Sequence, residues 1–167
     1  LLPNYRGAAP INWAIINGDE ESGVTTFFID EAIDSGKIIA QEKVKISSST
    51  NAGELHDELM SVGAELTLKT VAAISQQTHT VIDQDKFDGK DFKTAPKIFK
   101  EDCEISWDET VQNVHNKIRG LSPYPAAWTF FKDGEQEWNV KIYEAEFKLE
   151  EHSLKTGTIV TTKKEMS

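Results

Sequence analysis

The sequence predicts an α/β protein built in two parts, and three observations support this. A long helical periodicity occupies residues 51–75, strand-like runs rich in β-branched and aromatic residues lie before it and far after it, and residues 76–102 lack periodicity. Charges of both signs mark that last stretch as an exposed connector. We therefore expect an α/β part over residues 1–80, a linker over residues 81–102 and a second part over residues 103–167.

The first part is predicted to begin with a loop, a short helix and two strands. Pro10 suits the first turn of a helix, where its missing N–H costs nothing, and Asn17 lies near the expected end. Residues 24–29 are β-branched and aromatic, which favours a strand, and residues 37–46 alternate less cleanly as a second one. Residues 30–36 between them have the composition of a loop.

Two further helices show capping signals. Asn51 with Glu54 three residues later is typical of a capping box, and apolar residues then recur at steps of three and four. In the second part, Ser106 and Glu109 have the same spacing before an apolar helical face, and Gly120 is placed to end that helix. We expect helices at both places.

Antiparallel strands are predicted to follow the last helix. Residues 127–131 and 137–143 are rich in aromatic residues, and the Asp-Gly pair within residues 132–135 is a strong hairpin signal. The second part therefore reads as one helix followed by antiparallel strands.

Composition narrows the class of protein. The net charge of −10 on 167 residues argues against a protein that depends on nonspecific attraction to polyanions. No apolar run approaches the 18–20 residues or so that a membrane span needs. Cys103 is the single cysteine, so an internal disulfide and a cysteine-based zinc site are excluded, and a reducing cytoplasm is expected.

The loop over residues 30–36 is the most interesting candidate for chemistry. It holds Asp30 and Asp34 four residues apart, after a strand of the buried type, where α/β proteins usually bind ligands. A carboxylate there can orient a histidine or a water molecule. Composition alone favours a plain turn at Asp34, so the residues leave both interpretations open.

Lysines in the linker are a second candidate, for contact with phosphates. They include Lys97 and Lys100, but interleaved aspartates cancel most of their field, so a solvated connector is the simpler interpretation.

Several ordered motifs resemble the folate-dependent formyltransferases, and within that family the group acting on methionyl-tRNA. The similarity covers nearly the whole sequence. The matching segments are residues 1–13, 17–18, 23–25, 33–36, 96–98, 100–102, 105–107 and 118–128.

This resemblance implies a Rossmann-like formyltransferase domain, a linker and an OB-like β-barrel domain, of which the sequence would hold the C-terminal part of the first and the start of the last. The implied activity moves a formyl group from 10-formyltetrahydrofolate to the amino group of methionine on initiator tRNA. The full-length enzyme would be cytoplasmic and monomeric, with no metal and no membrane association.

The resemblance also implies roles for residues. The catalytic group that carries over is Asp34, because the family's Asn-x-His element would lie before Leu1, and the isolated chain is therefore expected not to turn over. The implied folate-binding residues are Asp30, Glu31, Ala32 and Ile33. The implied substrate-binding residues are Arg6, Gly7, Lys97, Lys100 and Arg119, the last three through the tRNA backbone.

Three alternatives remain open. A formyltransferase acting on an amino-sugar nucleotide shares the Arg-Gly-x-x-Pro opening and the end of the Asp34 loop, while the second half of the sequence looks more like the tRNA enzyme. The hydrolase-like domain of formyltetrahydrofolate dehydrogenase shares the Ile-Arg-Gly corner at residues 118–120. A non-catalytic binding module would also be compatible with a chain that lacks the Asn-x-His element.

Overall fold

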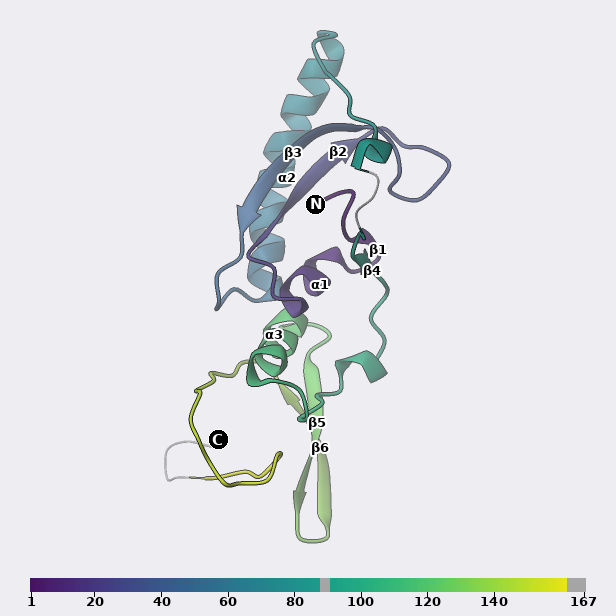
Figure 1. Cartoon of the computed structure of the whole chain (residues 1–167). Coiled ribbons are helices and arrows are strands. Elements are labelled where there is room, and N and C mark those ends of the chain that lie inside the picture. Colours follow the sequence, from purple (N-terminus) through teal and green to yellow (C-terminus); the bar gives the residue numbers. More distant parts are fainter. Residues whose placement is uncertain (88–90, 162–167) are drawn as a thin grey trace.

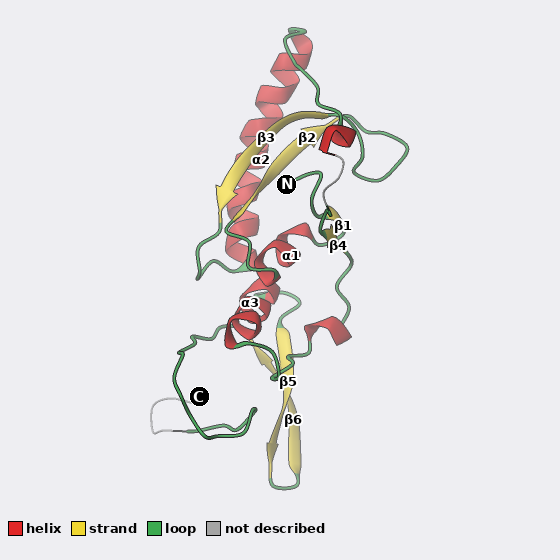
Figure 2. Ribbon diagram, in the orientation of Figure 1, coloured by secondary structure: helices red, strands yellow, loops and turns green. Residues whose placement is uncertain are grey.

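The computed structural model describes residues 1–87 and 91–161, and it arranges them as an elongated molecule with the two parts in contact (Figures 1 and 2). Residues 88–90 of the expected linker and 162–167 of the expected second part lie outside this description. The helices are α1 (Pro10–Ile16), α2 (Ala52–Ser75) and α3 (Val111–Leu121), with 3-10 turns η1 (Gln84–Phe87) and η2 (Glu101–Cys103). The strands are β1 (Arg6–Gly7), β2 (Glu21–Phe27), β3 (Ile38–Lys45), β4 (Thr94–Ala95), β5 (Ala127–Asp133) and β6 (Gln136–Ile142).

An antiparallel pair, β2 and β3, forms the sheet of the first part, with α2 along one of its faces (Figure 1). The pairing runs from Glu21 opposite Lys45 to Phe27 opposite Ile38, with one irregularity at Thr26. Buried side chains from β3, α1 and α2 fill the space between these elements, among them Ile15, Val44, Ile46, Leu55 and Leu59. The two predicted strands and the loop between them are thus confirmed.

The long helix begins where the capping box predicts. Asn51 Oδ1 accepts a hydrogen bond from Glu54 N at 3.0 Å, and Glu54 Oε2 accepts one from Asn51 N at 2.9 Å. Two backbone donors that the helix itself cannot pair are satisfied in this way.

The linker is less of a free connector than its composition suggests. It returns to the start of the chain, where β4 pairs in parallel with β1 and places Gly7 opposite Ala95. A Cβ atom on Gly7 would lie 2.2 Å from Ala95 O, so only glycine permits this approach. The indole of Trp13 on α1 also donates to Pro96 O at 2.8 Å. The linker is therefore held in place by its pairing with the N-terminal segment, although its polar composition is typical of a free connector.

Helix α3 packs against α1 and differs from prediction at both ends. Its N-cap is Thr110, whose Oγ1 accepts from Asn113 N at 3.2 Å, and not Ser106. Gly120 lies inside the helix, and a Cβ atom there would come within 2.7 Å of Ile16 Cγ1. This glycine therefore allows two helices to approach closely, and the prediction that it ends α3 is wrong.

The predicted hairpin is confirmed as β5 and β6, which pair from Ala127 opposite Ile142 to Asp133 opposite Gln136. The hairpin extends away from α3, at the opposite end of the molecule from the tip of α2 (Figure 1). Within residues 103–161 this is the one sheet present, so the structure shows an α/β arrangement with a C-terminal part but does not show the expected barrel.

Candidate functional site

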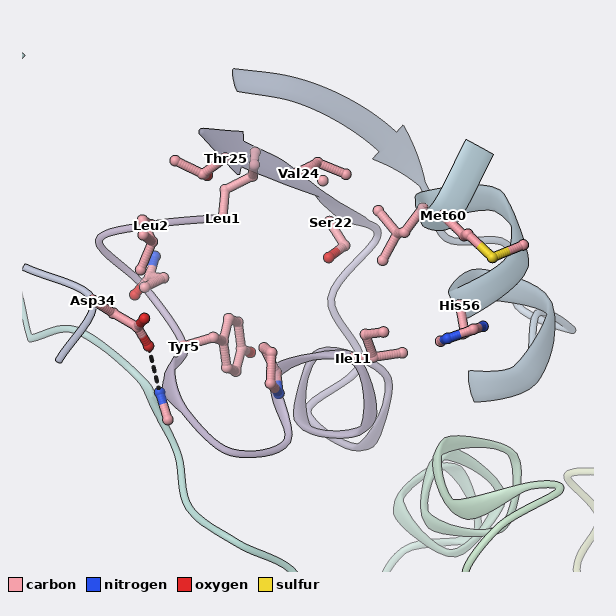
Figure 3. A pocket seen from close by; sticks show the side chains of 15 residues that line it. Leu1, Leu2, Tyr5, Ile11, Ser22, Val24, Thr25, Asp34, His56 and Met60 are labelled. Carbon is pink, nitrogen blue, oxygen red and sulfur yellow. Dashed lines mark hydrogen bonds between the residues drawn. The ribbon is translucent and has the colours of Figure 1, made fainter. Parts of the chain in front are cut away.

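A cavity of about 480 Å³ opens between the N-terminal segment, α1, β2 and the first turns of α2 (Figure 3). Apolar side chains form most of its wall, while Asp34 and His56 lie on opposite sides of it (Figure 3). The lining residues are Leu1, Leu2, Asn4, Tyr5, Gly7, Pro10, Ile11, Ser22, Gly23, Val24, Thr25, Asp34, His56, Leu59 and Met60. A largely apolar hollow with a few polar groups is the usual form of a small-molecule site.

The Asp34 carboxylate faces this cavity from the loop between β2 and β3. Its Oδ2 accepts a hydrogen bond from Gly7 N at 3.4 Å (dashed in Figure 3). The backbone at Asp34 has φ of 56°, in the left-handed region, which non-glycine residues adopt at a cost of about 1 kcal/mol or more. A strained carboxylate at a cavity wall is a candidate for function.

The loop carrying Asp34 is closed at its base. Phe28 N donates to Lys37 O at 3.0 Å, and a Cβ atom on Gly36 would lie 1.6 Å from Phe28 O. Only glycine fits at that crossing point. The two ends of the loop therefore meet, and Asp34 is held near one of them.

Gln84, on η1, braces the same loop and has no counterpart in the sequence-based prediction. Its side-chain Nε2 donates to Asp34 O at 2.9 Å and to Gly36 O at 2.8 Å, and its Oε1 accepts from Arg6 Nη2 at 2.5 Å. The side chain is only 3% exposed. These partners lie 48 to 78 residues away along the chain, so no local pattern could have revealed the contact.

Arg6 and Gly7 thus lie close to Asp34, with the Gly7 amide bound to its carboxylate and the Arg6 guanidinium bound to Gln84; their role in substrate binding stays a prediction. Asp30, Glu31, Ala32 and Ile33 form the exposed outer part of the loop. Ile33 is 83% exposed, so its apolar side chain is available for contact with a ligand.

Tyr5, which lines the cavity, takes part in a polar network with residues behind it. Its hydroxyl donates to Asp19 Oδ2 at 2.7 Å and accepts from Asn17 Nδ2 at 3.1 Å, and Lys93 Nζ lies 2.6 Å from Asp19 Oδ1. Burial, followed by the hydrogen bond to Asp19, raises the pKa of Tyr5. The tyrosine therefore stays protonated and acts as a fixed donor to the carboxylate.

Arg119 has an internal role that the prediction of a tRNA contact did not foresee. It is 8% exposed, and it donates from Nε to Asn116 Oδ1 at 3.0 Å and from Nη1 to Ser47 O at 3.0 Å and Thr50 O at 2.8 Å. Burial lowers the pKa of its guanidinium. A side chain used in this way joins α3 to the segment before α2, and the tRNA contact that the resemblance implies for Arg119 stays a prediction.

Lys97 and Lys100, in contrast, are exposed beside aromatic rings. Lys97 Nζ lies 5.4 Å from the centre of the Phe99 ring, and Lys100 Nζ lies 5.9 Å from that of Trp128. They lie near η2, away from the residues that line the Asp34 cavity.

Histidines elsewhere do not join Asp34. On α2, His56 Nδ1 lies 3.0 Å from Asp57 Oδ1 across the cavity from Asp34. The tripeptide Asn113-Val114-His115 has the Asn-x-His order, but it lies on α3, where the His115 ring packs against Phe147. It does not line the cavity that Asp34 faces.

Comparison with known proteins identifies this architecture. A formyl transferase family model matches residues 1–71, and a model of the formyl transferase C-terminal domain matches residues 97–167. The chain belongs to the formyltransferase family. It is 50% identical over 99% of its length to a methionyl-tRNA formyltransferase of Flavobacterium johnsoniae, and 54% identical over 98% to that of Azobacteroides pseudotrichonymphae. In both cases it spans about half of the relative, 52%.

Solved structures of formyltransferases share the fold. An N-formyltransferase from Helicobacter canadensis, solved with folinic acid and dTDP-3-aminofucose, is 25% identical with a TM-score of 0.63, over 84% of this chain and 60% of that one. A 4-N formyltransferase from Francisella tularensis, at 24% identity, has a TM-score of 0.67 over 88% of this chain and 60% of that one. This chain therefore has the α/β formyltransferase fold with parts of both an N-terminal and a C-terminal domain.

No helix within residues 1–87 and 91–161 is long and apolar enough to cross a membrane. In the same residues, no three His, Cys, Asp or Glu side chains converge as they would around a metal ion.

Proposed function

We propose that the chain is part of an enzyme that transfers a formyl group from 10-formyltetrahydrofolate to the amino group of methionyl-initiator-tRNA. The observation that carries this proposal is the placement of Asp34, whose carboxylate faces the cavity beside the Gly7 amide in a chain about half identical to methionyl-tRNA formyltransferases. Cytoplasmic location and a monomeric full-length enzyme belong to the same proposal.

The chemistry requires a group like Asp34. When an amine attacks a formyl carbonyl, negative charge develops on the carbonyl oxygen and the nitrogen must lose a proton. A fixed carboxylate can stabilise a charged imidazole or hold an ordered water that takes this proton. The hydrogen bond from Gly7 N and the left-handed backbone fix the direction in which Asp34 presents its oxygens.

The folate co-substrate would be held by the loop that carries Asp34. Asp30, Glu31, Ala32 and Ile33 are exposed residues, and the Ile33 side chain offers apolar surface for a planar ring. The apolar wall of the cavity nearby suits the same kind of ligand. The co-substrate supplies the activated one-carbon group, and these residues would bind and orient it.

Lys97 and Lys100 would contact the tRNA backbone. Both residues are exposed, with their ammonium groups 5.4 and 5.9 Å from the centres of aromatic rings, and phosphates can reach exposed lysines. The net charge of −10 limits this attraction, so the contacts would position the tRNA more than they would supply affinity.

The test is a formylation assay on the complete natural gene product. It should formylate methionyl-tRNA with 10-formyltetrahydrofolate as donor, and Asp34→Asn should lower kcat by about 10²–10³-fold. The isolated chain, tested in parallel, is expected to be inactive. An amino-sugar nucleotide is the competing acceptor, because the related structure from Helicobacter canadensis was solved with one. Turnover of that acceptor and not of methionyl-tRNA would replace the proposal.

A further inference from the structure

We propose that Gln84 is a positioning residue for the catalytic Asp34, a role that rests on the proposed function and adds to it. Among the residues of the cavity wall, Gln84 hydrogen-bonds to Asp34 alone, and it does so through the Asp34 backbone carbonyl. It would act by holding the conformation in which the carboxylate faces the cavity.

The Gln84 amide is fully used in one orientation. Its two N–H hydrogens meet the carbonyls of Asp34 and Gly36, while its oxygen meets the guanidinium of Arg6. Rotating the amide by 180° would set its oxygen against two carbonyl oxygens and its NH₂ against a cation. Because the side chain is buried, water could not replace these partners, so the orientation is fixed by the environment.

These contacts link Asp34 to Gln84, Gln84 to Arg6, and Arg6, through the peptide chain, to Gly7 and back to Asp34. Gln84 holds the Asp34 carbonyl, Arg6 holds Gln84, and Gly7, the next residue along the chain, donates to the Asp34 carboxylate. One residue is therefore fixed at both its backbone and its side chain by groups that are tied to each other. A left-handed aspartate persists only where its surroundings determine it in this way.

The fold places Gln84 independently of the loop it braces. Ile38 and Ile82 exchange two backbone hydrogen bonds of 2.9 Å, which anchor the segment before η1 to the first residue of β3. Gln84 follows two residues later, at the start of η1. Because Ile38 is buried, at 2% exposure, the amide has a fixed base from which to hold Asp34 and Gly36.

The experiment measures formylation kinetics in the complete gene product. Gln84→Ala removes all three contacts, and Gln84→Glu keeps the volume and the acceptor for Arg6 but loses both donors. Both variants are expected to lower kcat by about 10–100-fold with little change in KM for methionyl-tRNA, since an orientation error of about 1 Å has effects of this size. The exposed Gln136 provides the control, and Gln136→Ala should keep the native kcat.

A double-mutant comparison separates positioning from general support of the fold. If Gln84 acts through Asp34, then adding Gln84→Ala to Asp34→Asn should lower kcat no further. A further loss as large as in the native background would overturn the proposal, as would folded Gln84→Ala and Gln84→Glu variants with kcat within about twofold of native.

Amide hydrogen exchange tests the positioning role of Gln84 without depending on the proposed enzymatic activity. Gln84→Ala should speed exchange of the Gly7 amide, which donates to Asp34 Oδ2, and of the Phe28 amide, which donates to Lys37 O at the base of the loop, by about tenfold or more, whether or not the protein formylates methionyl-tRNA. Unchanged exchange would refute the positioning role. Native kcat in Asp34→Asn would instead refute the catalytic role of Asp34, and with it the proposed function of this site.

Discussion

Replacement of Arg119 by alanine should weaken the contact between the two parts of the molecule. The guanidinium makes three hydrogen bonds, of 3.0, 3.0 and 2.8 Å, to Asn116 Oδ1, Ser47 O and Thr50 O. Ser47 is exposed and Thr50 partly exposed, so water can reach their carbonyls once the arginine is gone, and the value for an ordinary hydrogen bond applies although the donor is charged. At about 1 kcal/mol per bond, we expect a loss of about 3 kcal/mol.

Urea unfolding measures this loss. With a slope typical of a domain of this size, the midpoint of Arg119→Ala should fall by about 1–2 M. The control is Lys132→Met, which removes an exposed ion pair with Glu137 and should change stability by less than about 0.5 kcal/mol. Exchange of the Gly53 amide, which donates to Ser122 O at 3.1 Å, should also speed up in Arg119→Ala. Equal midpoints for Arg119→Ala and Lys132→Met would refute the reasoning.

Three further outcomes follow from individual residues. Gly7→Ala should destabilise the protein by about 2–4 kcal/mol in thermal unfolding, because its Cβ would overlap Ala95 O, and native stability would contradict the β1–β4 approach. Burial, followed by the positive charge of Arg119, lowers the pKa of His115 below its ordinary value of 6.5. As the pH falls below 6.5, the unfolded chain therefore binds a proton at His115 more readily than the folded protein does, and the free energy of unfolding should fall. His115→Gln should remove this part of the acid sensitivity in urea titrations, whereas the exposed His152→Gln should not. Cys103 is 2% exposed and burial raises the pKa of its thiol, so a thiol reagent should label it at least about 100-fold more slowly than in urea, and fast labelling of the native protein would contradict this.

The sequence predicted those elements that are fixed by interactions between residues close together in the chain. The capping box of Asn51 and Glu54 and the hairpin signal of the Asp-Gly pair each involve residues within a few positions of one another. The structure has the capping box and the hairpin, although the turn itself is Gly134-Glu135 and Asp133 is the last residue of β5, paired with Gln136. The start of α3 was misplaced because Ser106 and Glu109 have the right spacing by chance, while Trp107 between them donates to Thr129 Oγ1 at 2.9 Å. A contact 22 residues away holds this segment outside the helix.

The residues of the candidate site likewise fall into those that the sequence could predict and those that depend on the fold. Asp34 could be singled out from its loop and from the family resemblance, but its brace could not, because Gln84 lies in a stretch with no periodicity and acts on partners far along the chain. Gly120 was given the commonest role of a glycine near a helix end, and the close packing of Ile16 against it required knowledge of the fold. For Arg119 the resemblance implies a phosphate contact, and no local pattern predicts its hydrogen bonds to the Ser47 and Thr50 carbonyls, which lie 72 and 69 residues away along the chain.

The left-handed backbone at Asp34 limits which residues can replace this aspartate during evolution without changing the shape of the loop. Asparagine and glycine tolerate that conformation, so they would preserve the shape of the loop while discarding its negative charge. Glutamate retains the charge but is less suited to the backbone and reaches one methylene further. A relative that has lost transferase activity yet keeps this loop would therefore be expected to carry asparagine or glycine here, and a relative with glutamate would be expected to have remodelled the loop around it.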